Sequence, residues 1–506
     1  MKSIISYSLL VLLICSPAFS TMSPSNIIQA KETQQSNTDS QWPMESYNAQ
    51  HTGSSPYSSG DNPGGERWKF FLGQRSAGFN TPIIDAEGII YAANNWRDLY
   101  ALYPNGTVKW SHHYPGSFQL SNPALDTNQT LYVATENQLD AFYLNGTIKW
   151  SIPLNGNPYA QTIVGPDGSI LTAADNRLYT VSPNGTIIRS YTIPNVINGI
   201  SVDLQGNIYL SGWQNDYVYS LTPEGDLRWA FETCYIFDAL TIGKDGTAYF
   251  HSCPYVYALD QNGQFKWISD VDLDGRSPSI APDGTLIETS IRGSRIVGLD
   301  PSNGIYRWEY DVGDSTRYMT GASIDCDGTI YFAATDEHTA YLYSLSASGT
   351  LKWKTKLTCD FPYDVVDVYS NPAISSDGTV YLTTMYDAGN LFGGYVHVIG
   401  GGTIQNIKEG FLYFRGEEIV RTLKERTILL GAFTLNMTFY HPEQVMKVEV
   451  LIDNQTYCIL EQPPFECRFN TKLIGSHELE VRGYYVDKAI SKEKMSILFL
   501  IMARNH

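Results

Sequence analysis

Histidine, cysteine and basic residues are scarce in this chain of 506 residues. It has 9 His, 7 Cys and only 34 Lys and Arg against 52 Asp and Glu, which gives a formal net charge of -18. An electrostatic field of that sign repels the phosphate backbone of nucleic acids. We therefore expect no nucleic-acid partner.

Sequence motifs of common catalytic sites are also missing. The chain contains no Gly-x-Ser-x-Gly elbow, no His-Glu-x-x-His pair and no phosphate-binding glycine loop. His112 and His113 are adjacent, but no spacing of the other histidines completes a tetrahedral metal set. The sequence therefore points to no particular reaction, although loops that converge from several repeats could still form a site.

Long apolar runs are absent except at the N-terminus. Lys2 precedes an apolar stretch over residues 4–15, and small residues follow it. This pattern is typical of a secretory signal, and the run is shorter than the roughly 20 apolar residues of a membrane-spanning helix. We expect residues 1–20 to form a signal peptide; a lipid anchor on Cys15 is the alternative.

The mature chain is therefore expected to be secreted or exposed on the cell surface. Residues 21–41 are rich in Ser, Thr, Gln and Asn and show no apolar periodicity, so we expect a flexible tether there. We expect no transmembrane span after the signal.

The cysteines that remain after the signal are even in number, which suits an oxidising compartment. They are Cys234, Cys253, Cys326, Cys359, Cys458 and Cys467. Cys458 and Cys467 flank Pro463 and Pro464 symmetrically, so in a hairpin they would lie opposite each other, and we predict a disulfide between them. Cys234 and Cys253 should reach one rim of the same repeat, which predicts a second bridge. Cys326 and Cys359 should lie on opposite rims and stay unpaired.

A unit of about forty residues recurs eight times between residues 80 and 399. Each copy opens with small residues and an apolar pair, turns at Asp-Gly or a similar pair, and continues with Tyr and alternating apolar residues. Six copies end in a strand that carries Trp; these are Trp110, Trp150, Trp229, Trp267, Trp308 and Trp353. Arg189 occupies this position in another copy. Four short strands cannot bury both sheet faces alone, so we expect the tryptophans to pack between neighbouring sheets.

The eighth copy, over residues 370–399, has no strand with Trp at its end. Residues 66–72 contain the missing form, with Trp68, and precede the first copy. If this strand pairs into the eighth sheet, the ring closes without an open edge. The pattern predicts an all-β, eight-bladed β-propeller closed by an N-terminal strand, with seven blades as the alternative.

These repeats resemble pyrroloquinoline-quinone (PQQ)-type propeller repeats. The leader, with Trp42-Pro-Met44 and Gln50-His51-Thr52-Gly53, resembles the segment that commonly precedes them in exported proteins. The resemblance covers residues 42–402 and implies the propeller fold. The superfamily includes quinone-dependent dehydrogenases and scaffold subunits of outer-membrane assembly machinery. The vicinal cysteine pair of the dehydrogenases is absent here, so we expect no PQQ. We predict no cofactor apart from the calcium ion considered below.

Residues 403–506 lose the forty-residue period and alternate like the strands of a two-sheet sandwich. The stretch around residues 448–454, with Glu461-Gln-Pro-Pro-Phe465 and residues 475–481 after it, resembles immunoglobulin-like modules of bacterial and archaeal surface proteins. The resemblance implies an immunoglobulin-like spacer without enzymatic activity.

Aromatic residues outside the repeat positions collect on loops that enter the first strand of each unit or join its second and third strands. We refer to the edge formed by these loops as the loop rim. The tentative ligand-binding residues there are Trp96, Trp213, Tyr235, Arg317, Tyr318, Tyr363 and Tyr386. Aromatic faces with polar neighbours suit sugar stacking or peptide binding, while packing beneath the loops is the simpler interpretation.

The segment Asp270-Val-Asp272-Leu-Asp274-Gly275 alternates carboxylates as a calcium loop does. The twelfth position holds Ala281 instead of Glu, so a solvated acidic loop is the alternative. We predict no catalytic residue and only a tentative calcium site.

We expect an exported, non-catalytic propeller that binds protein or glycan through the loop rim. An exported enzyme acting on polysaccharide or an alcohol is one alternative, and a converging pair of carboxylates would favour it. A scaffold subunit of an envelope assembly complex is the other.

Overall fold

The protein is all-β over the residues that the computed structural model describes. These are residues 40–60, 62–74, 80–94, 97–116, 120–194, 196–212, 217–234, 236, 238–252, 254–271, 275–289, 294–313, 316–336, 339–359, 366–387, 392–401, 403–404, 411–414, 417–421, 427–430, 433–439, 441–469 and 473–501. Their one helical element is a short 3-10 turn, η1 (Pro442–Gln444). None of their helices is long and apolar enough to cross a membrane.

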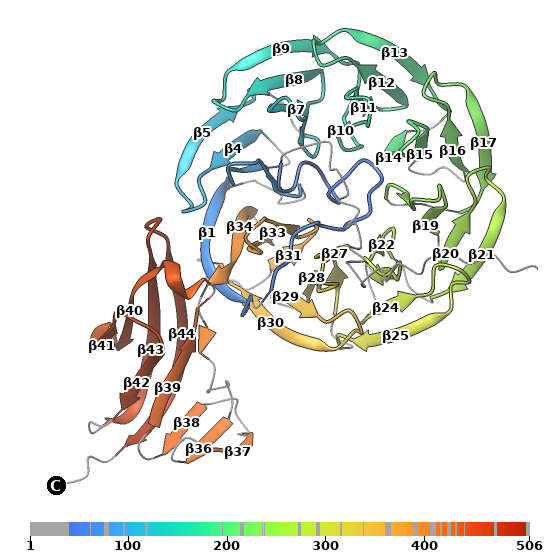
Figure 1. Ribbon diagram of the computed structural model, residues 1–506. Coiled ribbons are helices and arrows are strands. Elements are labelled where there is room, and N and C mark those ends of the chain that lie inside the picture. Colours follow the sequence, from blue (N-terminus) through green and yellow to red (C-terminus); the bar gives the residue numbers. More distant parts are fainter. Residues whose placement is uncertain are drawn as a thin grey trace, which may run out of the picture. The chain divides into compact units, whose positions relative to one another are not determined.

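Eight antiparallel sheets form a ring in the described residues (Figure 1). The first four sheets contain β2 (Ile83–Ile84), β3 (Ile90–Ala93), β4 (Asp98–Leu102) and β5 (Val108–His113); β6 (Ala124–Leu125), β7 (Thr130–Ala134), β8 (Gln138–Tyr143) and β9 (Ile148–Pro153); β10 (Ile163–Val164), β11 (Ile170–Ala174), β12 (Arg177–Val181) and β13 (Ile187–Thr192); β14 (Ile197–Val202), β15 (Ile208–Gly212), β16 (Tyr217–Leu221) and β17 (Leu227–Glu232).

The other four sheets complete the ring. They contain β18 (Thr241–Ile242), β19 (Ala248–Ser252), β20 (Tyr255–Leu259) and β21 (Phe265–Asp270); β22 (Ser279–Ile280), β23 (Leu286–Thr289), β24 (Arg295–Leu299) and β25 (Tyr306–Asp311); β26 (Tyr318–Met319), β27 (Ser323–Ile324), β28 (Ile330–Thr335), β29 (Ala340–Leu345) and β30 (Leu351–Leu357); β31 (Val366–Val368), β32 (Ala373–Ile374), β33 (Val380–Asp387), β34 (Phe392–Gly401) and β1 (Gly65–Gln74).

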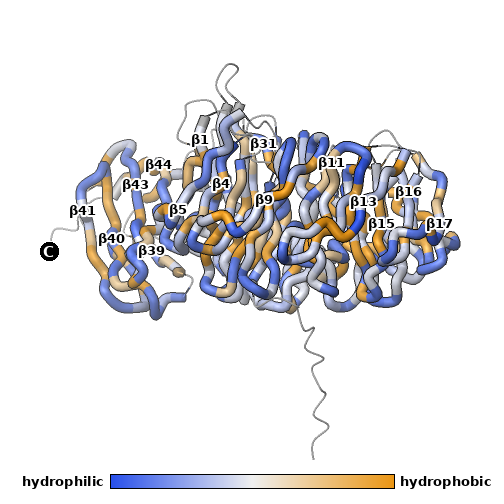
Figure 2. Tube along the Cα trace, turned by 90° about the horizontal axis from the view of Figure 1, so that it is seen from above, coloured by the Kyte–Doolittle hydropathy of each residue, from blue (hydrophilic) through white to orange (hydrophobic). Residues whose placement is uncertain are grey.

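Within each sheet, the first strand lies nearest the centre of the ring and the last strand lies at its outer edge. Figure 1 shows β5, β9, β13 and β17 on the outer circumference, with the two-residue strands such as β10 near the middle. Burial follows this order: every residue of β7 is buried, whereas β9 alternates between exposed and half-buried positions. In Figure 2, hydrophobic residues follow the strands and hydrophilic residues gather at the turns. The expected Asp-Gly turns join first to second strands, as at Gly168, where φ is +79°.

The repeated tryptophans pack between neighbouring sheets, which confirms their predicted role. The indole N–H of Trp110 donates to the carbonyl of Leu144 at 2.9 Å, and the ring covers Gly146 in the next sheet. The same ring-on-glycine contact recurs around the ring for the pairs Trp68 with Gly106, Trp150 with Gly185, Trp229 with Gly263, Trp267 with Gly304, Trp308 with Gly349 and Trp353 with Gly64. Only glycine leaves room for the indole so close to the backbone.

In the third sheet, which has no Trp on its outer strand, two residues together make the contact with the next sheet. Arg189 donates to the carbonyl of Pro223 at 2.9 Å, as a tryptophan N–H does elsewhere. Tyr191, two positions later on the same face of β13, places its ring over Gly225. The hydrogen bond and the aromatic contact are thus both kept without an indole.

An N-terminal strand closes the ring, as predicted. β1 pairs antiparallel with β34, with Trp68 opposite Val398. Trp68 then donates to the carbonyl of Pro104 in the first sheet at 2.8 Å. The last sheet is therefore built from both ends of the repeat array, and its outer strand contacts the first sheet as every other outer strand contacts its neighbour.

The leader segment, which we define as residues 40–60 and 62, crosses the middle of the ring (Figure 1). Its backbone exchanges hydrogen bonds with the innermost strands of six sheets. The bonds join Trp42 to Ile84, Pro43 to Leu125, Ala49 to Val202, Gln50 to Ile242, Thr52 to Ile280 and Gly53 to Ile324, at 2.7–3.0 Å. The Asn62 side chain donates to Gly378 and Ile399 in the eighth sheet, and His51 contacts Gln161 beside β10. The leader segment therefore contacts all eight sheets.

Two sheets face each other in the C-terminal part. The smaller contains β35 (Thr403–Ile404), β39 (Phe433–Thr438) and β42 (Phe465–Phe469); the larger contains β37 (Glu417–Arg421), β36 (Phe411–Phe414), β38 (Thr427–Leu430), β44 (Ile490–Ile501), β43 (Leu473–Tyr485), β40 (Val445–Ile452) and β41 (Gln455–Leu460). Buried residues of both sheets share one core, with Leu435 and Phe469 from the smaller sheet and Val450 and Phe499 from the larger. A two-sheet sandwich was expected, and its immunoglobulin-like class stays a prediction.

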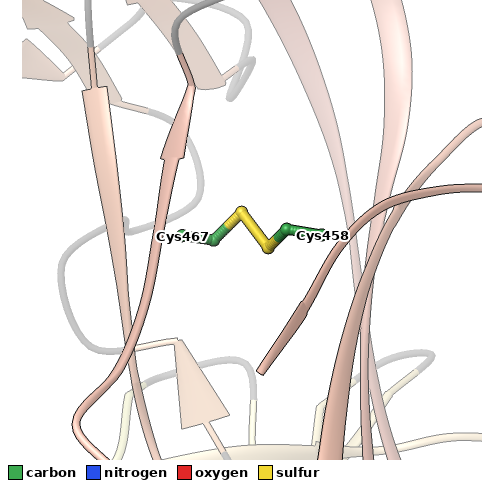
Figure 3. The surroundings of a disulfide bond; sticks show 2 residues. All are labelled: Cys458 and Cys467. Atoms are coloured by element: carbon green, nitrogen blue, oxygen red, sulfur yellow. A yellow bond between two sulfur atoms is a disulfide. The ribbon is translucent and has the colours of Figure 1, made fainter. Parts of the chain in front are cut away.

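The disulfide between Cys458 and Cys467 is present (Figure 3). The predicted geometry around it was wrong, because the two residues do not face each other in a hairpin. β41 pairs with β40, whereas β42 pairs with β39. The proline-containing turn carries the chain from one sheet to the other, so the disulfide links the two sheets. Cys253 lies outside the described residues, and a bridge from Cys234 to it stays a prediction.

Substitution of Gly146 tests the stacking of tryptophan on glycine. An added Cβ in Gly146→Ala would meet the Trp110 ring at 2.8 Å, at a backbone φ of +88°. Gly168→Ala is the matched control, because φ is +79° there and nothing lies within 4 Å of the added carbon. We expect the control to lower the free energy of unfolding by about 1 kcal/mol and Gly146→Ala to lower it by about 2–4 kcal/mol.

Chemical denaturation of both variants measures this difference. Equal losses of stability in the two variants would show that the tryptophan contact contributes nothing beyond backbone strain.

Candidate functional site

The tentative ligand-binding residues fall into two groups. Arg317, Tyr318 and Tyr386 lie in the described part of the chain. Trp96, Trp213, Tyr235 and Tyr363 lie outside the described residues, so their role at the loop rim stays a prediction.

Arg317 and Tyr318 lie together at the seventh sheet, and Tyr369 joins them from the eighth. The Arg317 guanidinium carbon lies 5.9 Å from the centre of the Tyr318 ring. The rings of Tyr318 and Tyr369 are 5.6 Å apart. Arg317 is exposed and the two tyrosines are half-buried. We call these three residues the rim cluster; it offers a guanidinium and two aromatic rings to a ligand.

Tyr386 does not belong to an accessible surface, which corrects its assignment to the loop rim. Its exposed fraction is 1%, and its ring packs on Phe71 and Tyr395. The simpler interpretation, that some loop aromatics pack beneath the loops, holds at this position.

The leader segment brings a carboxyl group into the ring. Glu45 is half-buried, and its carboxylate accepts a hydrogen bond from Asn122 at 2.6 Å. Asn122 precedes β6, and its own amide oxygen accepts from the backbone N–H of Thr81 at 2.8 Å. On the next residue of the leader segment, Ser46 accepts from Asn371 at 3.3 Å. Side chains from the second and eighth sheets therefore hold the leader near Glu45.

Glu45 does not ionise as an ordinary carboxylic acid. Burial, and next the charge of Asp238, raise the pKa of Glu45 to about 7, although Arg276 and the hydrogen bond from Asn122 oppose the shift. A carboxyl group with a pKa near neutrality can exchange a proton at physiological pH.

Asp238 and Arg276 come from the loops that enter β18 and β22. Their nearest charged atoms, Oδ2 and Nη1, lie 3.7 Å apart, beyond hydrogen-bond distance, and both side chains are partly exposed. Arg276 also donates from Nη2 to the carbonyl of Tyr369 at 3.3 Å. We call Glu45, Asn122, Asp238 and Arg276 the inner cluster, and Tyr369 connects it to the rim cluster.

A buried pair supports the loop that carries Arg276. The Gly275 N–H donates to Nε2 of His251 at 3.0 Å, so the ring proton of His251 is on Nδ1, which donates to Glu288 at 2.9 Å. Burial and the charge of Asp238 raise the pKa of Glu288 to about 7. Both side chains are almost completely buried. The pair therefore fixes the start of the segment from which Arg276 extends.

His51 remains neutral inside the ring. Its Nε2 accepts from the Gln161 amide at 2.9 Å, and burial lowers the pKa of His51 to about 4. Asp238 opposes this shift, so its charge acts on His51 as well as on Glu45 and Glu288.

No group of three or more His, Cys, Asp or Glu in the described residues could hold a metal ion. Asp270 ends β21 and is exposed, whereas Asp272 and Asp274 lie outside the described residues. The calcium loop therefore stays a prediction.

Sequence reasoning missed the inner cluster. The positions of three of its residues in the repeats could have indicated it. Asn122, Asp238 and Arg276 each lie just before the first strand of a repeat, which is the innermost strand of its sheet. The convergence of these loops on Glu45 depends on the path of the leader segment, which no repeat period reveals.

Residues 58–269 match the family model described as outer membrane protein assembly factor BamB, a PQQ-repeat family. The chain contains a PQQ-like β-propeller. The matched residues include the end of the leader segment, β1 of the eighth sheet and the strands of the first five sheets, and the remaining sheets are antiparallel as well. A search of curated proteins finds no match.

Several solved structures are similar to this chain at low identity. BamB from Moraxella catarrhalis is 14% identical, covering 65% of this chain and 99% of its own, with a TM-score of 0.48. Virginiamycin B lyase from Staphylococcus aureus is 13% identical, covering 65% and 98%, with a TM-score of 0.40. The Pan2 WD40 domain from Neurospora crassa is 14% identical, covering 55% and 96%, with a TM-score of 0.42. Likenesses at this level carry no information on function.

Glu45→Gln tests the unusual ionisation of the inner cluster. Because the pKa of Glu45 rises from 4.5 to about 7 on folding, the folded chain retains a proton that the unfolded chain releases between these values. This contribution to stability is present at low pH and is lost as the pH rises to about 7. The Glu45→Gln variant lacks this titration. As the pH rises from 4.5 to 7, its free energy of unfolding should therefore increase by on the order of 2 kcal/mol relative to that of the wild type.

Denaturation of both proteins at several pH values gives this difference. Glu288 and His51 also titrate but are unchanged, so their contributions cancel. Glu87→Gln, at an exposed turn position, is the control for the loss of a surface carboxylate. If the difference in free energy of unfolding between Glu45→Gln and the wild type does not change with pH, the raised pKa of Glu45 is contradicted.

Proposed function

We propose that this chain is an exported, non-catalytic propeller that binds a protein partner through its loop rim, with the C-terminal sandwich as an immunoglobulin-like spacer. The observation that carries the proposal is the match of the repeats to the BamB assembly-factor family. A role in assembling or holding proteins of the cell envelope is consistent with this match. The expected signal peptide and the disulfide between Cys458 and Cys467 support export.

The leader segment is held inside the ring, so we expect a partner to bind at the loop rim rather than to the leader. Its backbone is hydrogen-bonded to the innermost strands, and Trp42 and Met44 are buried. The rim cluster, in contrast, leaves Arg317 exposed and the rings of Tyr318 and Tyr369 partly accessible. Tyrosine and arginine are enriched among residues that dominate the energy of protein interfaces.

Tyr318→Ala tests this proposal. Purified mature chain is cross-linked to an envelope fraction of the source organism, and the partner is identified and then assayed as a purified protein. Loss of the Tyr318 ring should weaken binding about tenfold or more, as for an aromatic residue at an interface centre. Tyr103→Ala is the matched control, because Tyr103 is exposed at the end of β4, by the turn to β5.

Equal binding of the two variants would contradict the proposal. Retention of the wild type on a glycan array, without any protein partner, would favour a glycan ligand instead.

Acid–base catalysis is a second candidate, favoured by the proximity of the Glu45 and Asp238 charges. The pKa of about 7 at Glu45 would suit a general acid, and Asp238 would be the second acidic side chain of the pair. Release of reducing ends from polysaccharides, abolished in Glu45→Gln, would support this activity.

A further inference from the structure

Within the described part of the chain, Arg276 makes few polar contacts for a half-buried guanidinium. Among the described residues its hydrogen bond is the 3.3 Å contact to the carbonyl of Tyr369. Its Nη1 lies 3.7 Å from Asp238, and its buried Nε has no hydrogen-bond partner there. The hydroxyl of the next residue, Ser277, is also buried without a partner. Unmet donors in a partly buried site are costly, and an acceptor from a ligand would satisfy them.

Arg317, in the seventh sheet, lies over the ring of Tyr318, which in turn lies 5.6 Å from the ring of Tyr369. The Arg317 side chain makes no hydrogen bond or ion pair within the described residues, and it is exposed over the Tyr318 ring. The positive charges of Arg276 and Arg317 both act on the Tyr369 phenol, where they oppose the rise of its pKa to about 12. Two guanidinium groups with spare donors therefore lie around one tyrosine.

We propose that Arg276 and Arg317 bind the carboxylate group of a ligand beside Tyr369, supplied by an acidic side chain of a protein partner or by a small organic acid. This inference rests on the proposed binding function and specifies its chemistry. A guanidinium presents two parallel N–H groups that match a carboxylate, and the nearby tyrosine rings give the ligand an apolar surface.

The neighbouring acids favour a singly charged ligand over a phosphate. Asp238 occupies the side of Arg276 without hydrogen-bonding to it, and Glu45 lies within electrostatic reach of both. A doubly charged phosphate would be repelled more strongly than a carboxylate by these groups and by the net charge of -18. We expect the ligand carboxylate to replace the weak contact between Asp238 and Arg276.

Binding should respond to pH through Glu45. The charged or titratable groups that act on it are Asp238, from the fifth sheet, and Arg276, from the sixth; His51, on its own segment, is held neutral by burial. As the pH falls below about 7, Glu45 takes up a proton and its repulsion of an incoming carboxylate disappears. The affinity for the ligand should therefore rise on acidification. Glu45→Gln should weaken this dependence, and the remainder should come from Glu288, whose pKa burial also raises to about 7 and which lies near the charge of Asp238.

Calorimetry with two probes tests the proposal on the full mature chain. The probes are a blocked hexaglutamate peptide and free glutarate, with a blocked hexaglutamine peptide as the neutral comparison. Arg276→Gln and Arg317→Gln should each weaken binding about tenfold or more, and Arg276→Lys, which keeps the charge, should weaken it less. Asp238→Asn should strengthen binding, because it removes the competing charge and keeps the acceptor for the Ala239 N–H.

Arg177→Gln is the matched control, since Arg177 is exposed at the start of β12 in the third sheet. Tighter binding of the peptide than of glutarate would identify a protein side chain as the source, and equal binding would identify a small acid. Absence of binding by both probes, equal binding of hexaglutamine, or weaker binding in Asp238→Asn would overturn the proposal.

The two proposals can fail separately. A partner captured through Tyr318 whose affinity is unaffected by Arg276→Gln would leave the binding function intact and refute the carboxylate site. Probe binding that depends on Arg276 without any captured protein would support the site and refute the protein-binding function.

Discussion

The structure depends on closure of the ring, because a four-stranded sheet of short strands cannot bury both of its faces. Each sheet covers one face of its neighbour through an aromatic ring that packs on a glycine. In seven of the eight sheets a side chain at this contact also donates a hydrogen bond to a carbonyl of the neighbour. β1 extends this contact to the last sheet by pairing with β34. Where Trp is replaced by Arg189, Tyr191 restores the ring contact, which shows that the geometry matters more than the residue type.

The leader segment places a titratable side chain, Glu45, inside this scaffold. Its carbonyl groups accept hydrogen bonds from the innermost strands, and this fixes Glu45 between loops that enter different sheets. The charge of Asp238 then acts on Glu45 and also on Glu288 and His51, which lie outside the inner cluster. Tyr369 links the inner cluster to the exposed Arg317 and Tyr318, where a ligand can approach.

The repeat architecture could be predicted from the sequence because it is written in short-range patterns: Asp-Gly turns, alternating strands and a tryptophan every forty residues. Two errors came from contacts between distant segments. Cys458 and Cys467 flank a turn symmetrically, but that turn changes sheets, so the disulfide is not within a hairpin. Tyr386 resembles a loop aromatic, yet Phe71 from the closing strand buries it. The inner cluster was missed for the same reason, since Glu45 meets Asp238 and Arg276 only through the path of the leader.

Hydrogen–deuterium exchange of the amides that bond to the leader tests the central claim most directly. The N–H groups of Leu125, Val202, Ile242, Ile280 and Ile324 donate to leader carbonyls. The account predicts that they exchange as slowly as the amides of the buried second strands, because the leader stays seated across the ring. Rapid exchange at these five positions, with the second strands still protected, would show that the leader is not held there and that the inner cluster does not form.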